Sequence, residues 1–472
     1  MTSNWLSTER RALLDRLLEA QGISTSPALI RPRTTGSTVP LSFVQQRLWF
    51  LHQLMRDSPR YQISGGLWLR GPLDIAALHG ALELVVERHQ VLRTTYRVDR
   101  EGELAGHVGP VETELPLIEV EGGSDEALAI ARRLIATPLD PTTGPVFRTT
   151  LLKVADDHHL LVVMMHHIVS DGWSLDVLLK ELTTAYTDPR GLPELTVQYS
   201  DYAAWQQQRA QEQEALSGSS RTDPVLEHWR RRLDGAEPLR VPTDRPWPSR
   251  PTSAGSTLTE TIPADAAAAL LDLAKKRGAS PFAAAMAVST AAFSRLSGQT
   301  DIVVGMMVGG RERDELAPLV GCFMNTVPVR VDLSGDPAFS TVLDRVNAAV
   351  ITARAHADVP FERLVEALRL GRESGGRTPL VHHLVQLEEA PRPLLLGDLE
   401  IEPVGLFTDT AKFDLSACFA TTAGGGMTCR AEYSTELFDP GTVRRILGAV
   451  RRVAETVAED RPLSALPVER NC

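Results

Sequence analysis

The sequence predicts an α/β protein built from two lobes of similar size. The chain has 472 residues, enough for two or three domains at roughly 100–200 residues per domain. Segments with strand-like and helix-like spacing of apolar residues alternate along both halves. Prolines cluster between residues 238 and 251, and all seven tryptophans lie at or before Trp247, so the two halves also differ in composition.

The composition excludes several classes of protein. Hydrophobic residues make up 43% of the chain and charged residues 23%, as in globular rather than disordered or fibrous proteins. The net charge of -11 argues against nucleic-acid binding. No apolar run approaches the roughly 18 residues of a membrane span, and no signal peptide is visible. We therefore expect a cytoplasmic protein that binds neither nucleic acid nor membrane.

We expect four segments along the chain. Residues 1–37 should form an amphipathic helix followed by a linker rich in Ser, Thr, Pro and Arg. Residues 38–225 should form the N-terminal lobe and residues 256–472 the C-terminal lobe. The Pro-rich segment 226–255 is expected to link the two lobes.

Individual elements follow from the spacing of the apolar residues. Residues 75–89 have helical spacing, and residues 160–165 form an unbroken apolar run typical of a strand buried on both faces. Ser174 is expected to cap the next helix. In the second half, residues 302–308 predict a strand and residues 443–457 a closing helix.

One group of residues stands out chemically. His166 and His167 follow the predicted buried strand, and Asp171-Gly172 precedes the next helix. Because successive side chains of a strand point to opposite faces, only one of the two histidines can face a given cavity. A histidine at a strand end suits general-base work on an amine or hydroxyl. Asp171 can hold the turn through backbone or arginine contacts, and Gly172 permits a tight bend.

A second histidine doublet serves as an internal comparison. His158-His159 follows two aspartates and is expected at an exposed hairpin turn. A doublet alone therefore indicates little, since most such pairs are structural or solvated. A metal site is disfavoured because adjacent strand histidines diverge and no third ligand lies nearby. The four cysteines are far apart and form no CxxC pair, so neither a zinc site nor a disulfide framework is expected.

Other catalytic signatures are absent from the sequence. It contains neither a GxGxxG nor a GxxxxGK[ST] phosphate loop. No GxSxG elbow supplies a serine nucleophile. None of the cysteines has a histidine close in sequence, which leaves a thiol nucleophile unsupported.

Taken together, the motifs resemble the condensation domain of non-ribosomal peptide synthetases. That family is built from two lobes similar to chloramphenicol acetyltransferase. The resemblance extends from about Pro40 to Val468, and seven signature segments occur in order: residues 41–51, 88–96, 166–174, 199–206, 320–330, 356–364 and 372–380. The seventh has extra glycines and is followed by His382-His383, where the family is usually apolar.

The resemblance implies a V-shaped pseudo-dimer with a tunnel between its lobes. It also implies an amide-bond-forming acyltransferase of antibiotic and other secondary-metabolite biosynthesis. An acceptor aminoacyl thioester would attack a donor acyl or peptidyl thioester, each tethered to its own carrier protein. The phosphopantetheine arms would come from the carriers, so no cofactor of the chain's own is expected. The implied partners are donor and acceptor peptidyl carrier proteins and an adjacent adenylation domain.

The resemblance also implies roles for residues of the histidine motif. His167 would face the tunnel and deprotonate or position the amine, whereas His166 would point into the lobe. Gly172 would offer its backbone N–H to the thioester oxygen. Further residues are expected along the tunnel or near the substrate, namely Ser170, Trp173 and Asn325, although Asn325 could equally be a turn former.

Asp171 would form a structural salt bridge. Its partner is expected to be Arg311 of the second lobe, with Arg93 as the alternative.

The histidine motif resembles the subclass that joins two L-residues, yet it does not separate an amide from an ester product. Two other classes of function also remain open. The chain could be a stand-alone acyltransferase that uses a free acceptor. It could also be a non-catalytic recruitment domain, although such relatives usually have a damaged histidine motif. Adenylation and carrier domains after Cys472 would indicate a module fragment.

Overall fold

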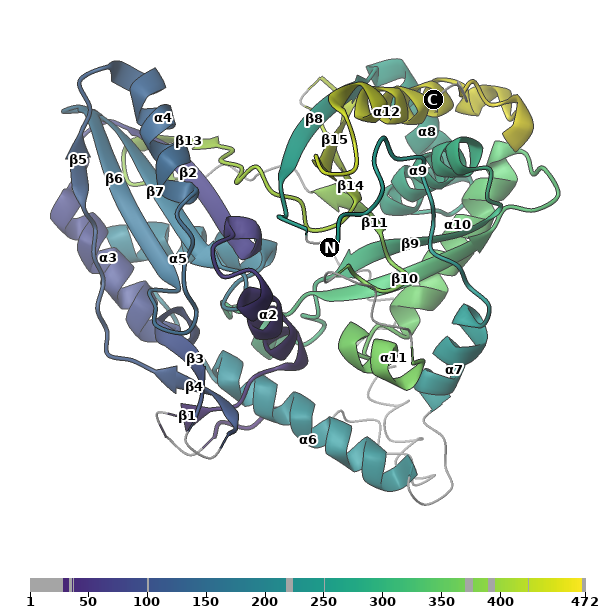
Figure 1. The fold of residues 1–472 in the computed structure, drawn as a ribbon. Coiled ribbons are helices and arrows are strands. Elements are labelled where there is room, and N and C mark those ends of the chain that lie inside the picture. Colours follow the sequence, from purple (N-terminus) through teal and green to yellow (C-terminus); the bar gives the residue numbers. More distant parts are fainter. Residues whose placement is uncertain are drawn as a thin grey trace, which may run out of the picture.

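The computed structural model describes residues 29–33, 36, 38–99, 102–217, 224–249, 251–369, 377–388, 395–422 and 424–468. They form two α/β lobes that meet at the base of a V (Figure 1), which confirms the predicted fold class. The helix expected near the N-terminus lies outside the described residues. No helix within the described ranges is long and apolar enough to cross a membrane.

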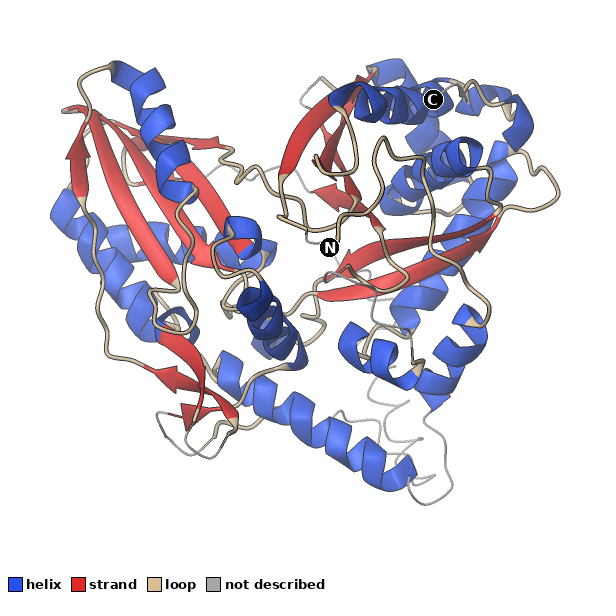
Figure 2. Cartoon of the chain, in the orientation of Figure 1, coloured by secondary structure: helices blue, strands red, loops and turns tan. Residues whose placement is uncertain are grey.

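The N-terminal lobe is built on a six-stranded sheet with the order β12-β13-β2-β7-β6-β5. Four of its strands come from the first half of the chain: β2 (Gln62–Arg70), β5 (Leu117–Glu119), β6 (Phe147–Ala155) and β7 (His158–His166). A small sheet below it has the order β1-β4-β3, made of β1 (Thr38–Val39), β3 (Thr94–Val98) and β4 (Leu104–Val108). Three helices cover the large sheet: α3 (Ile75–Arg88), α4 (Gly123–Ile135) and α5 (Gly172–Thr187) (Figure 2).

Strand β7 is buried on both faces, as its unbroken apolar run predicts. Leu161, Val163 and Met165 belong to the same core cluster as the apolar faces of α3 and α5. The alternating residues of the strand, such as Leu160 and Val162, belong to a second cluster with α4. The strand that ends in the histidine motif is therefore the rigid centre of the lobe.

The C-terminal lobe is built on a second six-stranded sheet, with the order β10-β9-β11-β14-β15-β8. Its strands are β8 (Gly255–Ile262), β9 (Asp301–Val308), β10 (Asn325–Asp332), β11 (His383–Glu388), β14 (Leu415–Thr421) and β15 (Met427–Ser434). The helices packed on it are α8 (Ala264–Lys276), α9 (Pro281–Ser297), α10 (Phe339–Ala355) and α12 (Pro440–Glu455). The strand expected at residues 302–308 is confirmed as β9.

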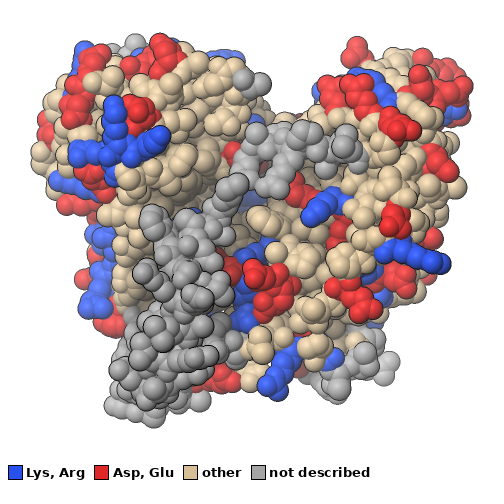
Figure 3. Space-filling view, turned by 180° about the vertical axis from the view of Figure 1, so that it is seen from behind, with Lys and Arg blue, Asp and Glu red and all other residues tan. Residues whose placement is uncertain are grey.

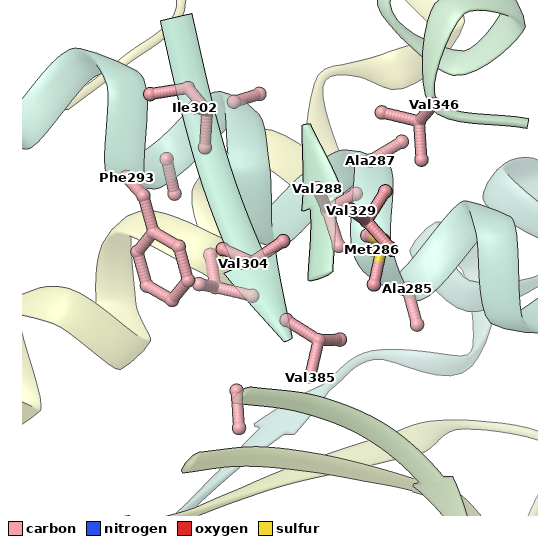
Figure 4. Packing of buried hydrophobic residues seen from close by; sticks show 14 of the residues in the cluster. Ala285, Met286, Ala287, Val288, Phe293, Ile302, Val304, Val329, Val346 and Val385 are labelled. Carbon is pink, nitrogen blue, oxygen red and sulfur yellow. The ribbon is translucent and has the colours of Figure 1, made fainter. Parts of the chain in front are cut away.

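Helix α9 forms the centre of the C-terminal core. Every residue from Ala283 to Ser294 is buried, as expected for a helix that is apolar all round. Its many alanines allow neighbouring elements to approach closely. Figure 4 shows its side chains among those of Val304 from β9, Val329 from β10 and Val385 from β11.

Four helices lie near the junction of the lobes: α2 (Phe43–Leu54), α6 (Tyr199–Ser217), α7 (Pro224–Leu233) and α11 (Phe361–Ala367). Helix α6 runs along the base of the V from the N-terminal lobe towards α7 (Figure 1). The segment expected as a linker, residues 226–255, contains most of α7. Its Trp229, Leu239 and Val241 are buried in the C-terminal core, so much of this segment is part of that lobe.

Two strands from the second half of the chain belong to the sheet of the first lobe. Strands β12 (Leu395–Leu396) and β13 (Leu399–Val404) extend the N-terminal sheet, with β13 antiparallel to β2. Arg70 Nη1 lies 2.8 Å from Glu402 Oε2 across this pairing. The two lobes are therefore not divided in space at the sequence boundary near residue 255.

Two local expectations need correction. His158 and His159 lie at the start of β7 rather than in the hairpin turn, which is formed by Asp156 and Asp157, and His159 is buried. The closing helix ends at Glu455, so Val457 falls in a short 3₁₀ turn instead.

On the face shown in Figure 3, acidic and basic side chains are interspersed over both lobes.

The packing of Trp229 yields a first prediction. Trp229 is 2% exposed, and its indole Nε1 donates to His356 O at 3.0 Å. We expect Trp229→Ala to destabilise the protein by ~3–5 kcal/mol because it leaves a cavity in the core. Thermal unfolding of Trp173→Ala, which changes a tryptophan that is 55% exposed, is the matched control. Equal losses of melting temperature in both variants would contradict the assignment of α7 to the C-terminal core.

Candidate functional site

The histidine loop connects the end of β7 to the start of α5 at the junction of the lobes. His166 is the last residue of β7; its Nδ1 accepts from Ile168 N at 3.1 Å, and its ring meets that of His52 edge-on at 5.6 Å. The backbone N–H of His167 donates to Tyr61 O at 2.7 Å. The two histidines face different surroundings, and only His167 lines the central cavity described below.

The hydrogen bond of His167 sets its tautomer. Nδ1 lies 2.8 Å from Ser170 O. A carbonyl oxygen only accepts, so Nδ1 carries the proton and Nε2 is the basic nitrogen of the ring. Ser170 was expected along the tunnel. It is instead fully buried, and its carbonyl orients His167.

The surroundings of His167 keep its ring neutral. Burial and, to a smaller extent, the Lys412 ammonium lower the pKa of His167 to about 4, against the opposing effect of Asp171. At neutral pH the ring is therefore ready to accept a proton. Cys322 Sγ lies 3.8 Å from His167 Nδ1. Burial raises the pKa of the Cys322 thiol well above its usual value, so the thiol stays protonated.

Asp171 joins the loop to the second lobe. Its Oδ2 lies 2.6 Å from Arg311 Nη1, and both side chains are at most 5% exposed. The same Oδ2 accepts from Phe323 N at 3.0 Å. Arg93, the alternative partner, donates to Val86 O at 3.3 Å within its own lobe. Arg311 is thus the partner of Asp171.

Asp171 also begins the next helix. Its Oδ1 accepts from the backbone N of Ser174 at 2.8 Å and from the Ser174 hydroxyl at 2.7 Å, which makes Asp171 the N-cap of α5. The helix begins at Gly172, two residues before the expected cap at Ser174. One carboxylate therefore uses one oxygen for the helix and the other for the neighbouring lobe.

Close packing fixes the loop of the second lobe that faces Asp171. A Cβ on Gly321 would lie 1.9 Å from Tyr199 Cδ2, so only glycine fits against this ring. Gly321 N donates to Ser174 Oγ at 3.0 Å. The hydroxyl of Tyr199 donates to Cys322 O at 2.5 Å. These contacts hold Cys322 beside the histidine loop.

Three adjoining cavities run between the lobes. The central cavity has about 60 Å³ of free space and is lined by Val44, Arg47, Leu48, Tyr61, His167, Met307, Cys322, Met324, Asn325, Thr326, Glu362, Lys412 and Phe413. An outer cavity of about 350 Å³ shares Val44, Met324, Asn325 and Glu362 with it. A rear cavity of about 20 Å³ shares Lys412 and Phe413. His167 therefore lines the central one of three cavities that share lining residues at the junction of the lobes.

The expected substrate-contacting residues lie at different places. Asn325 lines the central and outer cavities, but its side chain is locked: Nδ2 donates to Ala357 O and Val359 O, both at 2.8 Å. Trp173 lies on the surface, where its Nε1 donates to Ala317 O at 3.1 Å. Neither Trp173 nor Gly172 is among the residues that line the three cavities.

Two further residues of the site, Gln45 and Lys412, were not singled out from the sequence. Gln45 is buried on α2, and its Nε2 donates to Ile168 O at 2.9 Å and to Tyr96 OH at 2.8 Å, which supports the histidine loop. Lys412 lies outside all seven signature segments. Gln45 lies inside the first of them, so it could have been found there.

The seventh segment is only partly described. Residues 372–376 lie outside the described ranges, whereas Arg377 pairs with the buried Asp414. His383 begins β11 and His382 directly precedes it; both are buried, and burial lowers the pKa of each to about 3.

Two α/β lobes with a buried, neutral histidine at their junction define a pseudo-dimeric protein with the chloramphenicol acetyltransferase-like fold. The chain belongs to the condensation domain family, whose sequence model matches residues 36–465. The resemblance stated from the motifs is confirmed.

Individual relatives agree with this assignment. One of the linear gramicidin synthase proteins of Brevibacillus parabrevis is 37% identical over 484 residues, a match that covers 99% of this chain and 6% of that protein. The X-domain from teicoplanin biosynthesis is 29% identical with a TM-score of 0.84, covering 93% of this chain and 100% of the other. The condensation domain of the Monacolin K polyketide synthase MokA (TM-score 0.79, 20% identity, coverage 91% and 100%) supports the fold alone.

A double-mutant cycle tests the ion pair between the lobes. We expect Asp171→Ala to cost ~3–5 kcal/mol of stability because Arg311 is left as an uncompensated buried charge. Combined with Arg311→Ala, the loss should be smaller than the sum of the single losses. Thermal unfolding of the two single variants and the double variant measures this coupling, with Arg93→Ala in place of Arg311→Ala as the control. Strict additivity for Asp171 and Arg311 would contradict the pair.

The buried histidines predict a loss of stability in mild acid. His167, His382 and His383 have pKa values of about 4, 3 and 3 in the folded chain, against roughly 6.5 when unfolded. Below pH 6.5 the unfolded chain binds protons that the folded chain does not, so stability falls as the pH is lowered from about 6.5 towards 4.

Melting temperatures measured between pH 7.5 and pH 5 check this slope. Neither ring nitrogen of His383 has a hydrogen-bond partner among the described residues. His383→Leu should therefore fold and flatten the slope, by up to ~1.4 kcal/mol per pH unit. An unchanged slope in this variant would show that His383 is not a source of the acid sensitivity.

Proposed function

We propose that this chain forms an amide bond between a donor acyl or peptidyl thioester and an acceptor aminoacyl thioester, each tethered to a carrier protein. The observation that carries the proposal is the position of His167, whose neutral ring lines the central cavity between the lobes. The order of residues 166–174 favours the subclass that joins two L-residues.

The reaction follows from the tautomer of His167. The acceptor nitrogen attacks the donor carbonyl carbon, a C–N bond forms, and one electron pair of the C=O bond moves to oxygen. His167 Nε2 takes the proton that the nitrogen loses. The oxyanion then collapses, the C–S bond breaks, and the thiol of the donor carrier leaves with the proton from His167. The products are one amide and one free thiol.

Tethered substrates suit the dimensions of the three cavities. The central cavity is narrow, and a larger and a smaller cavity adjoin it. In the proposed function the donor and the acceptor reach His167 from these two sides. Tethering raises the local concentration of each substrate to roughly mM without requiring a tight pocket, and the walls need only position the reacting atoms. Kinship with a synthetase far longer than this chain supports carrier and adenylation domains as partners.

Substitution of His167 tests its role. We expect His167→Ala to lower the rate of amide formation by ~10²–10⁴, the contribution of a general base, with little change in melting temperature. His166→Ala should instead lower the melting temperature, because its buried ring hydrogen-bonds to the turn of the loop. The measurement is product mass after two loaded carriers are mixed with each variant. Wild-type turnover by a folded His167→Ala protein would refute the proposed role.

A comparison of acceptors tests the need for tethering. We expect turnover with carrier-bound donor and acceptor to exceed turnover with soluble thioester mimics by ~10²-fold or more, as effective concentration predicts. If a free amine or alcohol reacts as fast as the tethered acceptor, the two-carrier function fails and a stand-alone acyltransferase takes its place.

A further inference from the structure

Lys412 lies at the point where the central and rear cavities adjoin. It lines both, and its side chain is 28% exposed. Its backbone is fixed on two sides: the N–H donates to Glu432 Oε1 at 3.0 Å, and the carbonyl accepts from Arg60 of the N-terminal lobe. The residue is thus anchored at the junction of the lobes, and it lines the cavity that His167 also lines.

The two cations of the central cavity differ in how they are paired. Arg47 Nη1 donates to Glu362 Oε1 at 3.3 Å, and Arg47 also lies over the Phe361 ring. Lys412 Nζ is 3.8 Å from Glu432 Oε2, beyond hydrogen-bond distance. The Lys412 ammonium therefore has donors available for a ligand in the cavity.

The proposed reaction places a negative charge in this cavity. When the acceptor nitrogen attacks, the former carbonyl oxygen of the donor becomes an oxyanion, which needs donors or a cation already in place. Gly172, the donor expected from the sequence, does not line the cavity, whereas Lys412 does. We propose that Lys412 binds the carbonyl oxygen of the donor thioester and stabilises the oxyanion, a role that rests on the proposed function.

The same charge acts on the base. The Lys412 ammonium disfavours the protonated form of His167 before reaction, which keeps Nε2 free. As the oxyanion develops beside Lys412, it offsets that positive charge, and His167 becomes a stronger base when the proton is transferred. Other titratable or charged groups near the ring are Asp171, His166, Arg47, Glu362 and the protonated Cys322.

Three variants separate this role from a structural one. Lys412→Met removes the charge and keeps the length of the side chain, Lys412→Arg keeps the charge, and Glu432→Gln removes the partner of Lys412 while leaving its ammonium. We expect Lys412→Met to lower kcat by ~10²–10³, the usual cost of losing an oxyanion donor, with less than about a threefold change in KM. Lys412→Arg should retain most of the activity, and Glu432→Gln should stay within about threefold of wild type.

A second measurement does not depend on turnover. NMR titration of the His167 ring should show a higher pKa in Lys412→Met than in wild type, because one positive charge near the ring is gone. An unchanged His167 pKa would place the ammonium too far away to act at the reacting atoms and would overturn the proposal.

The kinetic outcomes are distinguishable. Wild-type kcat in Lys412→Met would overturn the role of Lys412. An equal loss in Glu432→Gln would also overturn it, because Lys412 would then act only by anchoring the loop before β14. A loss confined to KM would overturn it as well, since the contact would be made equally in the ground state. If the wild-type chain itself forms no amide from two loaded carriers, the proposed function fails, and Lys412 loses its role with it.

Discussion

The buried ion pair between Asp171 and Arg311 is the contact on which the rest of the site depends. Removing two charges from water is costly, and such a pair is tolerated where most of the remaining hydrogen-bonding capacity is satisfied. Here Asp171 also accepts from Ser174 and from Phe323 N, and Arg311 Nη2 donates to Leu319 O and Gly321 O. Among the described residues, Arg311 Nε has no partner. The pair therefore holds three segments in fixed positions relative to one another: the start of α5, the histidine loop and the facing loop of the other lobe.

The two lobes contribute different parts of the candidate site. The N-terminal lobe supplies His167, held by a strand buried on both faces and by the Ser170 carbonyl. The C-terminal lobe supplies Lys412, Asn325 and much of the cavity wall. Strand β13 of the second half pairs with β2 of the first, so the two halves of the chain are joined by a shared sheet as well as by the Asp171–Arg311 pair.

Much of the histidine site was predictable because its parts are local. The turn of residues 166–172 follows one strand directly and precedes one helix, so the divergence of His166 and His167 follows from the alternation of strand side chains. The helix start was misplaced at Ser174 because Asp171 and Ser174 are both good cap residues, and both take part in the observed capping box. Trp173 and Ser170 were assigned to the tunnel by their place in the motif. In the structure, Trp173 lies in the first turn of α5 and donates to Ala317 O, whereas the Ser170 hydroxyl donates to His166 O within the loop.

The sequence by itself determined the two α/β lobes, the buried strand before the histidines and the family, because periodicity and motif order are local properties of the chain. Only the tertiary structure decided that Arg311 and not Arg93 pairs with Asp171, that residues 399–404 complete the sheet of the other lobe, and that Lys412 reaches the cavity of His167. Each of these contacts joins residues more than a hundred positions apart. The entropy of closing such long loops grows only slowly with length, so the chain offers no local preference among distant partners. The packing of the whole fold selects among them.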